Sequence, residues 1–257
     1  MSQSRCYSWL AIFLIILVPA LFLVVPWLTG WAVPVLYSGL SQDLIILIIV
    51  VALNHYWFKM PIKFWHSQRG WQQLLVCLPA ILILLLPKAL GIWQVGRLPF
   101  SPMILFYGGY VGLIGITEEY IYRGVLLPLL AKALPGKTLL VIIIDSLAFG
   151  SVHLINLTGL NLSYVLPQLM LAAITGLLLC GVYLKTQNLI LPMLLHALSD
   201  VPMILTFMNH THNRSGLNIS NQGSLILGLG AFGLFLIITG FIYWQTRHLD
   251  IEKQLAN

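Results

Sequence analysis

The chain has 257 residues, of which 59% are hydrophobic and only 8% are charged. A soluble globular domain carries roughly 25% charged residues, so this composition excludes a soluble enzyme, a nucleic-acid-binding module and a disordered chain. The formal net charge of +6 does not indicate a nucleic-acid partner, because the basic residues are scattered and border apolar runs. We therefore expect an integral membrane protein whose surroundings are membrane lipid.

Continuous apolar runs, separated by turns or charges, predict eight membrane-spanning helices. They lie near residues 9–28, 43–60, 71–90, 103–131, 138–157, 164–184, 189–209 and 224–245. The first run has no clear cleavage site, and we expect it to be retained rather than removed as a signal peptide. The expected fold is an all-α, polytopic transmembrane helix bundle, with residues 1–257 forming a single integral membrane domain.

Basic residues outside the runs predict the orientation. If the N-terminus is inside, nine of them fall on the inner side and three on the outer side. The inner set is Arg5, Lys59, Lys63, Arg69, Lys132, Lys137, Lys185, Arg247 and Lys253, and the outer set is Lys88, Arg97 and Arg214. Positive charge is enriched on the cytoplasmic side of membrane proteins. We therefore expect an even number of spans with both termini cytoplasmic, in a bacterial plasma membrane.

Seven ionisable side chains interrupt three of these apolar runs. The fourth, fifth and seventh runs contain Glu118, Glu119, Arg123, Asp145, His153, His196 and Asp200. Each such group costs about 2.5–3.5 kcal/mol at the centre of an isolated spanning helix. The free-energy cost of burying so many charges disfavours an inert polar network that only holds helices together. The distribution predicts one shared functional site, although straight helices with these boundaries would place Glu118, His153 and His196 at different depths.

Helical spacing assigns different roles to the two neighbouring glutamates. Glu119 and Arg123 are four residues apart, so they share a helix face and can form an ion pair. Glu118 points about 100° away from that face, which leaves it as the candidate general base. Just before them, Gly108, Gly112 and Gly115 predict a close approach to another helix.

The other two runs show the same four-residue spacing. Asp145, Phe149 and His153 form one stripe, and His196 lies one turn before Asp200, a spacing that lets a carboxylate orient an imidazole. This set of groups suits either a divalent metal that activates water or direct activation of water by the glutamate and a histidine. The H-E-x-x-H pattern of zincins is absent.

Three motifs carry a resemblance to a known family. Glu118-Glu119-Tyr120-Ile121-Tyr122-Arg123 matches E-E-x-x-x-R, Phe149 to His153 matches F-x-x-x-H, and His196 to Asp200 matches H-x-x-x-N/D. In this order on successive apolar runs, they resemble the CPBP family of CAAX prenyl endopeptidases and bacteriocin-processing enzymes, also called the ABI family. The resemblance covers a predicted catalytic core at about residues 103–209.

The resemblance implies an intramembrane endopeptidase that acts on a membrane-proximal peptide or prenylated protein. Glu118 and His153 would activate the hydrolytic water, and His196 with Asp200 would support the oxyanion. Glu119, Arg123 and Phe149 would support the site structurally. No cofactor is needed if the enzyme is a glutamate protease, whereas a zinc enzyme would use Glu118, His153 and His196 as ligands. Asp200 stands where the family often has asparagine, and an ionised aspartate cannot donate a hydrogen bond.

Members of this family in bacteria are also associated with self-immunity to bacteriocins. Two alternative functions, from other classes of protein, therefore remain beside that of a protease. One is a non-catalytic immunity protein of the membrane, for which the motif residues would be dispensable. The other is a small transporter that uses the same carboxylates, and inverted repeats between the two halves of the chain would favour it.

Overall fold

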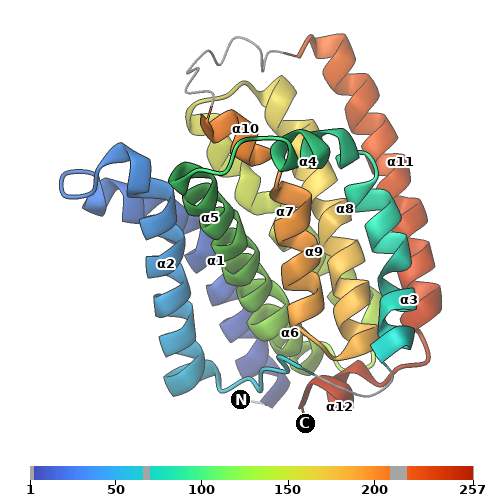
Figure 1. Ribbon diagram of the computed structural model, residues 1–257. Coiled ribbons are helices and arrows are strands. Elements are labelled where there is room, and N and C mark those ends of the chain that lie inside the picture. The colour runs from blue at the N-terminus through green and yellow to red at the C-terminus, as the bar shows by residue number, and fades with distance from the viewer. Residues whose placement is uncertain (1–2, 66–69, 209–218, 257) are drawn as a thin grey trace.

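The computed structural model describes residues 3–65, 70–208 and 219–256. Two of the basic residues used to predict the orientation, Arg69 and Arg214, lie outside these ranges, as does the last residue of the predicted 103–209 core. All of the regular secondary structure in the described part of the chain is helical, with no β-strand. The prediction of an all-α helix bundle is confirmed (Figure 1).

The helices follow the predicted apolar runs, but several runs are broken. In chain order the elements are α1 (Gln3–Thr29), α2 (Val35–Leu53), η1 (Asn54–Phe58), α3 (Gly70–Ala80), η2 (Ile81–Leu85), α4 (Ala89–Gly96), α5 (Pro102–Glu119), η3 (Tyr120–Leu126), α6 (Leu127–Ala133), α7 (Thr138–Ser151), η4 (Val152–Thr158), α8 (Leu162–Thr186), α9 (Ile190–Asp200), α10 (Met203–Met208), α11 (Asn221–Thr246) and α12 (Ile251–Ala256). The segments η1, η2 and η3 are π-helical, and η4 is a 3₁₀-helix.

Within the described ranges, five helical segments are long and apolar enough to cross a membrane, or six if the bent pair of α3–η2 and α4 counts as one span. That pair bends by 85°. Of the other two predicted spans, 103–131 contains the charged motif, and 189–209 is broken after α9 at Val201 and Pro202. Both ends of the chain lie at the same end of the bundle, as an even number of crossings requires (Figure 1). The count of eight and the cytoplasmic placement of the termini stay predictions.

Many large apolar side chains on the long helices point outward. Ile16 on α1, Ile48 on α2 and Ile237 on α11 are 64%, 59% and 71% exposed. Apolar surface of this size is unfavourable in contact with water, whereas it is compatible with the hydrocarbon of a membrane. Together with the apolar helices, this surface identifies a multi-pass membrane protein.

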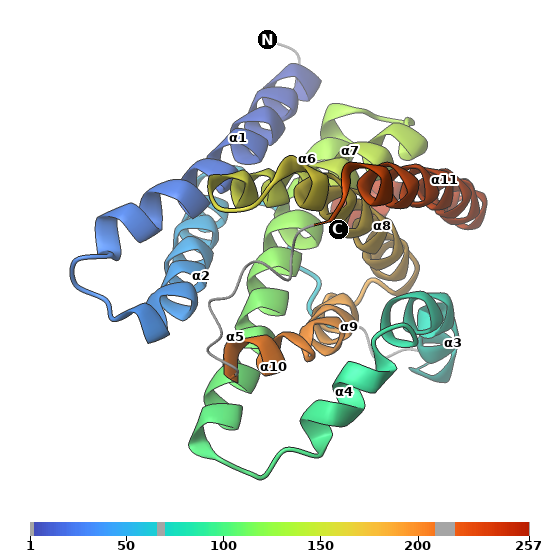
Figure 2. The ribbon, with the colours of Figure 1, turned by 90° about the horizontal axis from the view of Figure 1, so that it is seen from above.

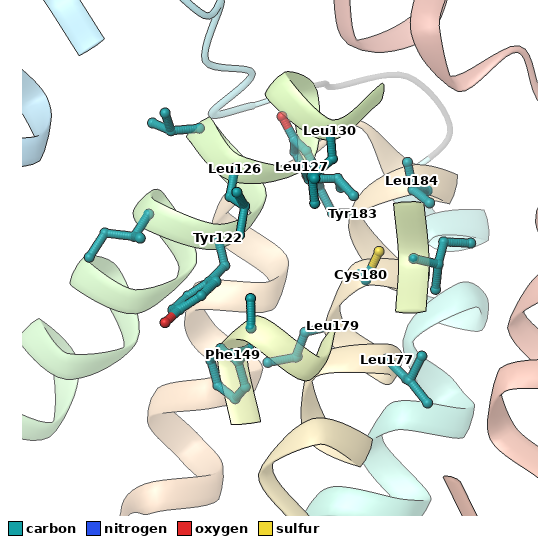
Figure 3. Close-up of a cluster of buried hydrophobic side chains, with 14 of the residues drawn as sticks. Tyr122, Leu126, Leu127, Leu130, Phe149, Leu177, Leu179, Cys180, Tyr183 and Leu184 are labelled. Carbon is teal, nitrogen blue, oxygen red and sulfur yellow. The ribbon is translucent and has the colours of Figure 1, made fainter. Parts of the chain in front are cut away.

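The helix α8 forms the centre of the bundle. It contacts α3, α7, α9 and α11, while α5 lies between α2 and α9 (Figures 1 and 2). The apolar core is built where η3 and α6 meet α7 and α8, and Tyr122, Leu126, Phe149, Leu179 and Tyr183 are among its side chains (Figure 3). The motif-bearing segments are therefore held by the best-packed part of the molecule.

Candidate active site

The first motif lies where α5 changes into the π-helical segment η3. Glu118 and Glu119 are the last two residues of α5, and Arg123 lies in the middle of η3. All three are buried, with Glu119 and Arg123 completely inaccessible. Arg123 Nη1 donates a hydrogen bond to Glu119 Oε1 at 2.9 Å, which confirms the ion pair predicted from the spacing.

Arg123 connects this motif to two further helices. Its Nη2 donates to the carbonyl oxygen of Gly176 on α8 at 2.7 Å, and its Nε lies 3.7 Å from Asp145 Oδ2 on α7. The guanidinium also stands over the Phe149 ring, with Cζ 4.6 Å from the ring centroid. A buried cation needs several such partners to offset the loss of hydration. Arg123 therefore fixes the positions of α5, α7 and α8 relative to one another.

The imidazole of His196 on α9 is surrounded by three carboxylates. Nδ1 lies 2.9 Å from Glu119 Oε1, and Nε2 lies 3.3 Å from Asp200 Oδ2 and 3.8 Å from Glu118 Oε2. The predicted contact between His196 and Asp200 is present. The shorter contact with Glu119 was not predicted, because it joins two different helices. A carboxylate only accepts hydrogen bonds, so Nδ1 carries a proton facing Glu119.

These distances bring Glu118 and His196 together, which straight helices with the predicted boundaries would not do. The run from 102 to 133 would be about 48 Å long if straight, which exceeds the roughly 30 Å hydrocarbon core. It is not aligned with the bundle, since α5 runs obliquely across it (Figure 1). The oblique course of α5 and the short, interrupted α9 bring the two residues together.

Asp200 has a partner that the sequence analysis placed elsewhere. Lys88 Nζ lies 3.6 Å from Asp200 Oδ1, and the Ser199 hydroxyl donates to the same oxygen at 3.1 Å. Lys88 was predicted to be an outer-loop residue, but it lies at the bend before α4 and turns toward α9. Both side chains are partly exposed, so this ion pair contributes little to stability and mainly orients Asp200.

The second motif supplies Phe149 and His153. The Phe149 ring meets the His196 ring edge to face, with centroids 5.5 Å apart. His153 lies in η4 and is half-buried, close enough to interact electrostatically with His196 and Asp200. Within the described part of the chain its side chain makes no hydrogen bond or ion pair. His153 thus borders the cluster with its ring nitrogens available.

A buried carboxylate on α2 was missed by the sequence analysis. Asp43 is 4% exposed, is hydrogen-bonded to the Tyr110 hydroxyl and interacts with the charge of Glu118. The Thr117 hydroxyl, next to Glu118, donates to the Asp43 carbonyl oxygen at 3.5 Å. Asp43 is the first residue of the predicted run 43–60, and it was not counted among the ionisable residues inside the runs. The available signal was that Asp43 is the only charged residue between Val35 and Leu53.

The side chains proposed as zinc ligands do not form a metal site in this arrangement. Among the described residues, no group of three or more His, Cys, Asp or Glu side chains is placed to hold a metal ion. Both ring nitrogens of His196 face carboxylates, at 2.9 and 3.3 Å. The geometry fits a hydrogen-bonded network of carboxylates and imidazoles better than the zinc set Glu118, His153 and His196.

Comparison with protein families gives one match. Residues 99–202 match the family described as Type II CAAX prenyl endopeptidase Rce1-like. These residues make up less than half of the chain, and this part of it is similar to the CAAX protease family. The matched residues include all three motifs, and the resemblance based on those motifs is confirmed. Searches of curated proteins and of solved structures found no similar chain. The match supports, at the level of the family, a CAAX-type intramembrane protease.

Proposed function

We propose that this chain is an endopeptidase that hydrolyses a peptide bond of a membrane-proximal peptide with water activated by Glu118. The observation that carries the proposal is that the two adjacent glutamates have different partners. Glu119 is committed to Arg123 and His196 at 2.9 Å each. Glu118 is buried, lies 3.8 Å from His196 Nε2 and makes no side-chain hydrogen bond among the described residues. A carboxylate without a committed cation beside an imidazole is suited to general base catalysis.

The proposed reaction needs only side chains of this cluster. Glu118, with His153, positions a water molecule and takes its proton as the water oxygen bonds to the carbonyl carbon of the peptide. The negative charge that develops on the carbonyl oxygen is supported by His196, whose orientation is held by Asp200 and Glu119. When the C–N bond breaks, the proton held by Glu118 passes to the leaving amine. Glu119, Arg123 and Phe149 support the site without touching the substrate.

The proposed substrate is a peptide at the membrane, such as a prenylated C-terminal segment or the leader of a bacteriocin. The cluster is enclosed by helices of a multi-pass membrane protein, so a substrate that is already at the bilayer reaches it most directly. We place the chain in a bacterial plasma membrane, and a role in bacteriocin processing or self-immunity follows from the same proposal.

The test is peptide cleavage by the purified full-length protein in lipid nanodiscs, with a farnesylated fluorogenic peptide and a leader peptide as probes. Glu118→Gln keeps the volume of the side chain and removes the base. We expect kcat/KM to fall about 10²- to 10⁴-fold. Glu252→Gln, on α12 at the end of the bundle, is the matched control and should retain full activity.

Other outcomes would contradict the proposal. Full cleavage by Glu118→Gln would remove the catalytic assignment. Activity that is lost in a chelator and restored by zinc would contradict direct activation of water. A wild-type protein that protects cells from a bacteriocin but cleaves no peptide would instead support the non-catalytic immunity protein.

A further inference from the structure

A cavity lies away from the motif residues, at the end of the bundle where both termini are found. It has a volume of about 320 Å³ and is formed by the connection between α6 and α7, the first turns of α7 and the last turn of α11. Figure 2 shows α7 next to α11, and α7 contacts both α6 and α11. Its lining residues are Gly136, Lys137, Thr138, Leu139, Leu140, Ile143, Tyr243 and Arg247.

The mouth of this cavity is positively charged. Lys137 and Arg247 are exposed, and among the side chains that the structure describes neither forms an ion pair. Lys137 is also the N-cap residue of α7, and its side chain makes no capping hydrogen bond to the first turn. The amides of a helix N-terminus attract negative charge. Two unpaired cations and an uncapped helix start therefore converge on one small volume.

The deeper wall of the same cavity is apolar. Leu139 and Leu140 are 38% and 41% exposed, and Ile143 continues the α7 face one turn further from the charged end. Tyr243 stands on the opposite wall, a residue type that favours the boundary between headgroups and hydrocarbon. The cavity thus has a cationic end followed, along the helix axis, by surface suited to hydrocarbon.

We propose that this cavity binds the headgroup of an anionic phospholipid, with its phosphate between Lys137 and Arg247 and its acyl chain along Leu139, Leu140 and Ile143. A free phosphate ion would use the charged end alone and leave the apolar wall without a function. The order of the two surfaces matches that of a lipid, with charge at the bundle end and hydrocarbon toward its middle. This site is independent of Glu118 and of the proposed protease activity.

The test measures lipid binding to the purified full-length protein in detergent by native mass spectrometry. Phosphatidylglycerol and phosphatidylcholine with the same acyl chains are the two lipids. We expect the wild type to retain phosphatidylglycerol preferentially. The double variant Lys137→Gln/Arg247→Gln should bind it about thirtyfold more weakly, the loss expected when two basic side chains near an anionic surface are removed.

The matched control is Arg5→Gln/Lys185→Gln, which removes the same charge from two exposed residues outside the cavity. This variant should bind phosphatidylglycerol as the wild type does. Equal losses in the two double variants would show general attraction to the basic surface and overturn the proposal. Displacement of the lipid by millimolar inorganic phosphate would also overturn it, in favour of a simple anion site. The variants' melting temperatures identify any loss that comes from unfolding.

Discussion

Glu119 Oε1 accepts from two groups at once, Arg123 Nη1 and His196 Nδ1, each at 2.9 Å. Through Oε1, Glu119 links α5 and η3 to α9. The other carboxylate oxygen of Glu119, Oε2, has no hydrogen-bond partner among the described residues. Glu119 thus acts as a positioning residue that holds His196 at a fixed orientation toward Glu118 and Asp200. The two neighbouring glutamates differ because only one of them can reach Arg123.

Removing the Glu119 carboxylate should therefore cost stability. In Glu119→Ala the Arg123 guanidinium stays fully buried with only Gly176 and the more distant Asp145 as partners. Breaking a buried ion pair from one side typically costs about 3–5 kcal/mol. We expect a free energy of unfolding lower by about that amount, measured by denaturant titration of the protein in detergent.

The surface ion pair between Asp250 and Lys253, at 3.3 Å, is the control for this variant. Both of its side chains are exposed, so Lys253→Ala, which removes the ion pair and keeps the Asp250 cap of α12, should leave the stability unchanged. Equal stability of Glu119→Ala and the wild type would show that Glu119 does not hold Arg123 in place.

At the scale of elements, the site depends on close contact between α5 and α9. The sequence suggested that Gly108, Gly112 and Gly115 together allow such a contact, and this is correct only for Gly115. A Cβ added there would lie 2.8 Å from the carbonyl oxygen of Met193 and 3.0 Å from the amide nitrogen of Ala197. At Gly108 and Gly112, nothing lies within 4 Å of such an atom.

This difference predicts opposite effects of two similar substitutions. Gly115→Ala places a methyl group against the backbone of α9, one residue from His196, and should destabilise the protein by about 1–3 kcal/mol. By forcing the helices apart it should also lower peptide cleavage. Gly112→Ala meets open space and should be neutral or stabilising by up to about 1 kcal/mol, since glycine is unfavourable within a helix.

Thermal unfolding and cleavage assays on the two variants test this prediction. A Gly115→Ala protein as stable and active as Gly112→Ala would mean that α5 and α9 do not need the close contact.

The same elements show what could be read from the sequence. Hydrophobic runs located the helices, and four-residue spacing located the pairs within one helix, such as Glu119 with Arg123. The contact of Glu119 with His196 and the ion pair of Lys88 with Asp200 could not be predicted. Both depend on how helices cross, bend and break, and the π-helical turns of η1, η2 and η3 have no strong local sequence signal.

At the scale of the whole molecule, charge is divided between the interior and the ends. Five of the seven acidic residues, Asp43, Glu118, Glu119, Asp145 and Asp200, lie inside the bundle. Lys88 and Arg123 are the cations that pair with this group. The other basic side chains in the described ranges lie near helix ends or in the connections between helices, where they can contact headgroups. This separation allows a chain with few charges both to set its orientation and to build a polar site in the membrane.

The predicted orientation can be tested with the cysteines of the chain. Cys77 and Cys180 are buried, so replacing the exposed Cys6 by serine leaves no accessible thiol. Lys253→Cys then reports on the end of the bundle that holds both termini, and Arg97→Cys, just after α4, reports on the opposite end (Figure 1). If the more basic end is cytoplasmic, a membrane-impermeant maleimide should label position 97 in intact cells and position 253 only after permeabilisation. The reverse pattern would contradict the inner placement of the termini, and labelling of both positions in intact cells would contradict the transmembrane separation of the two ends.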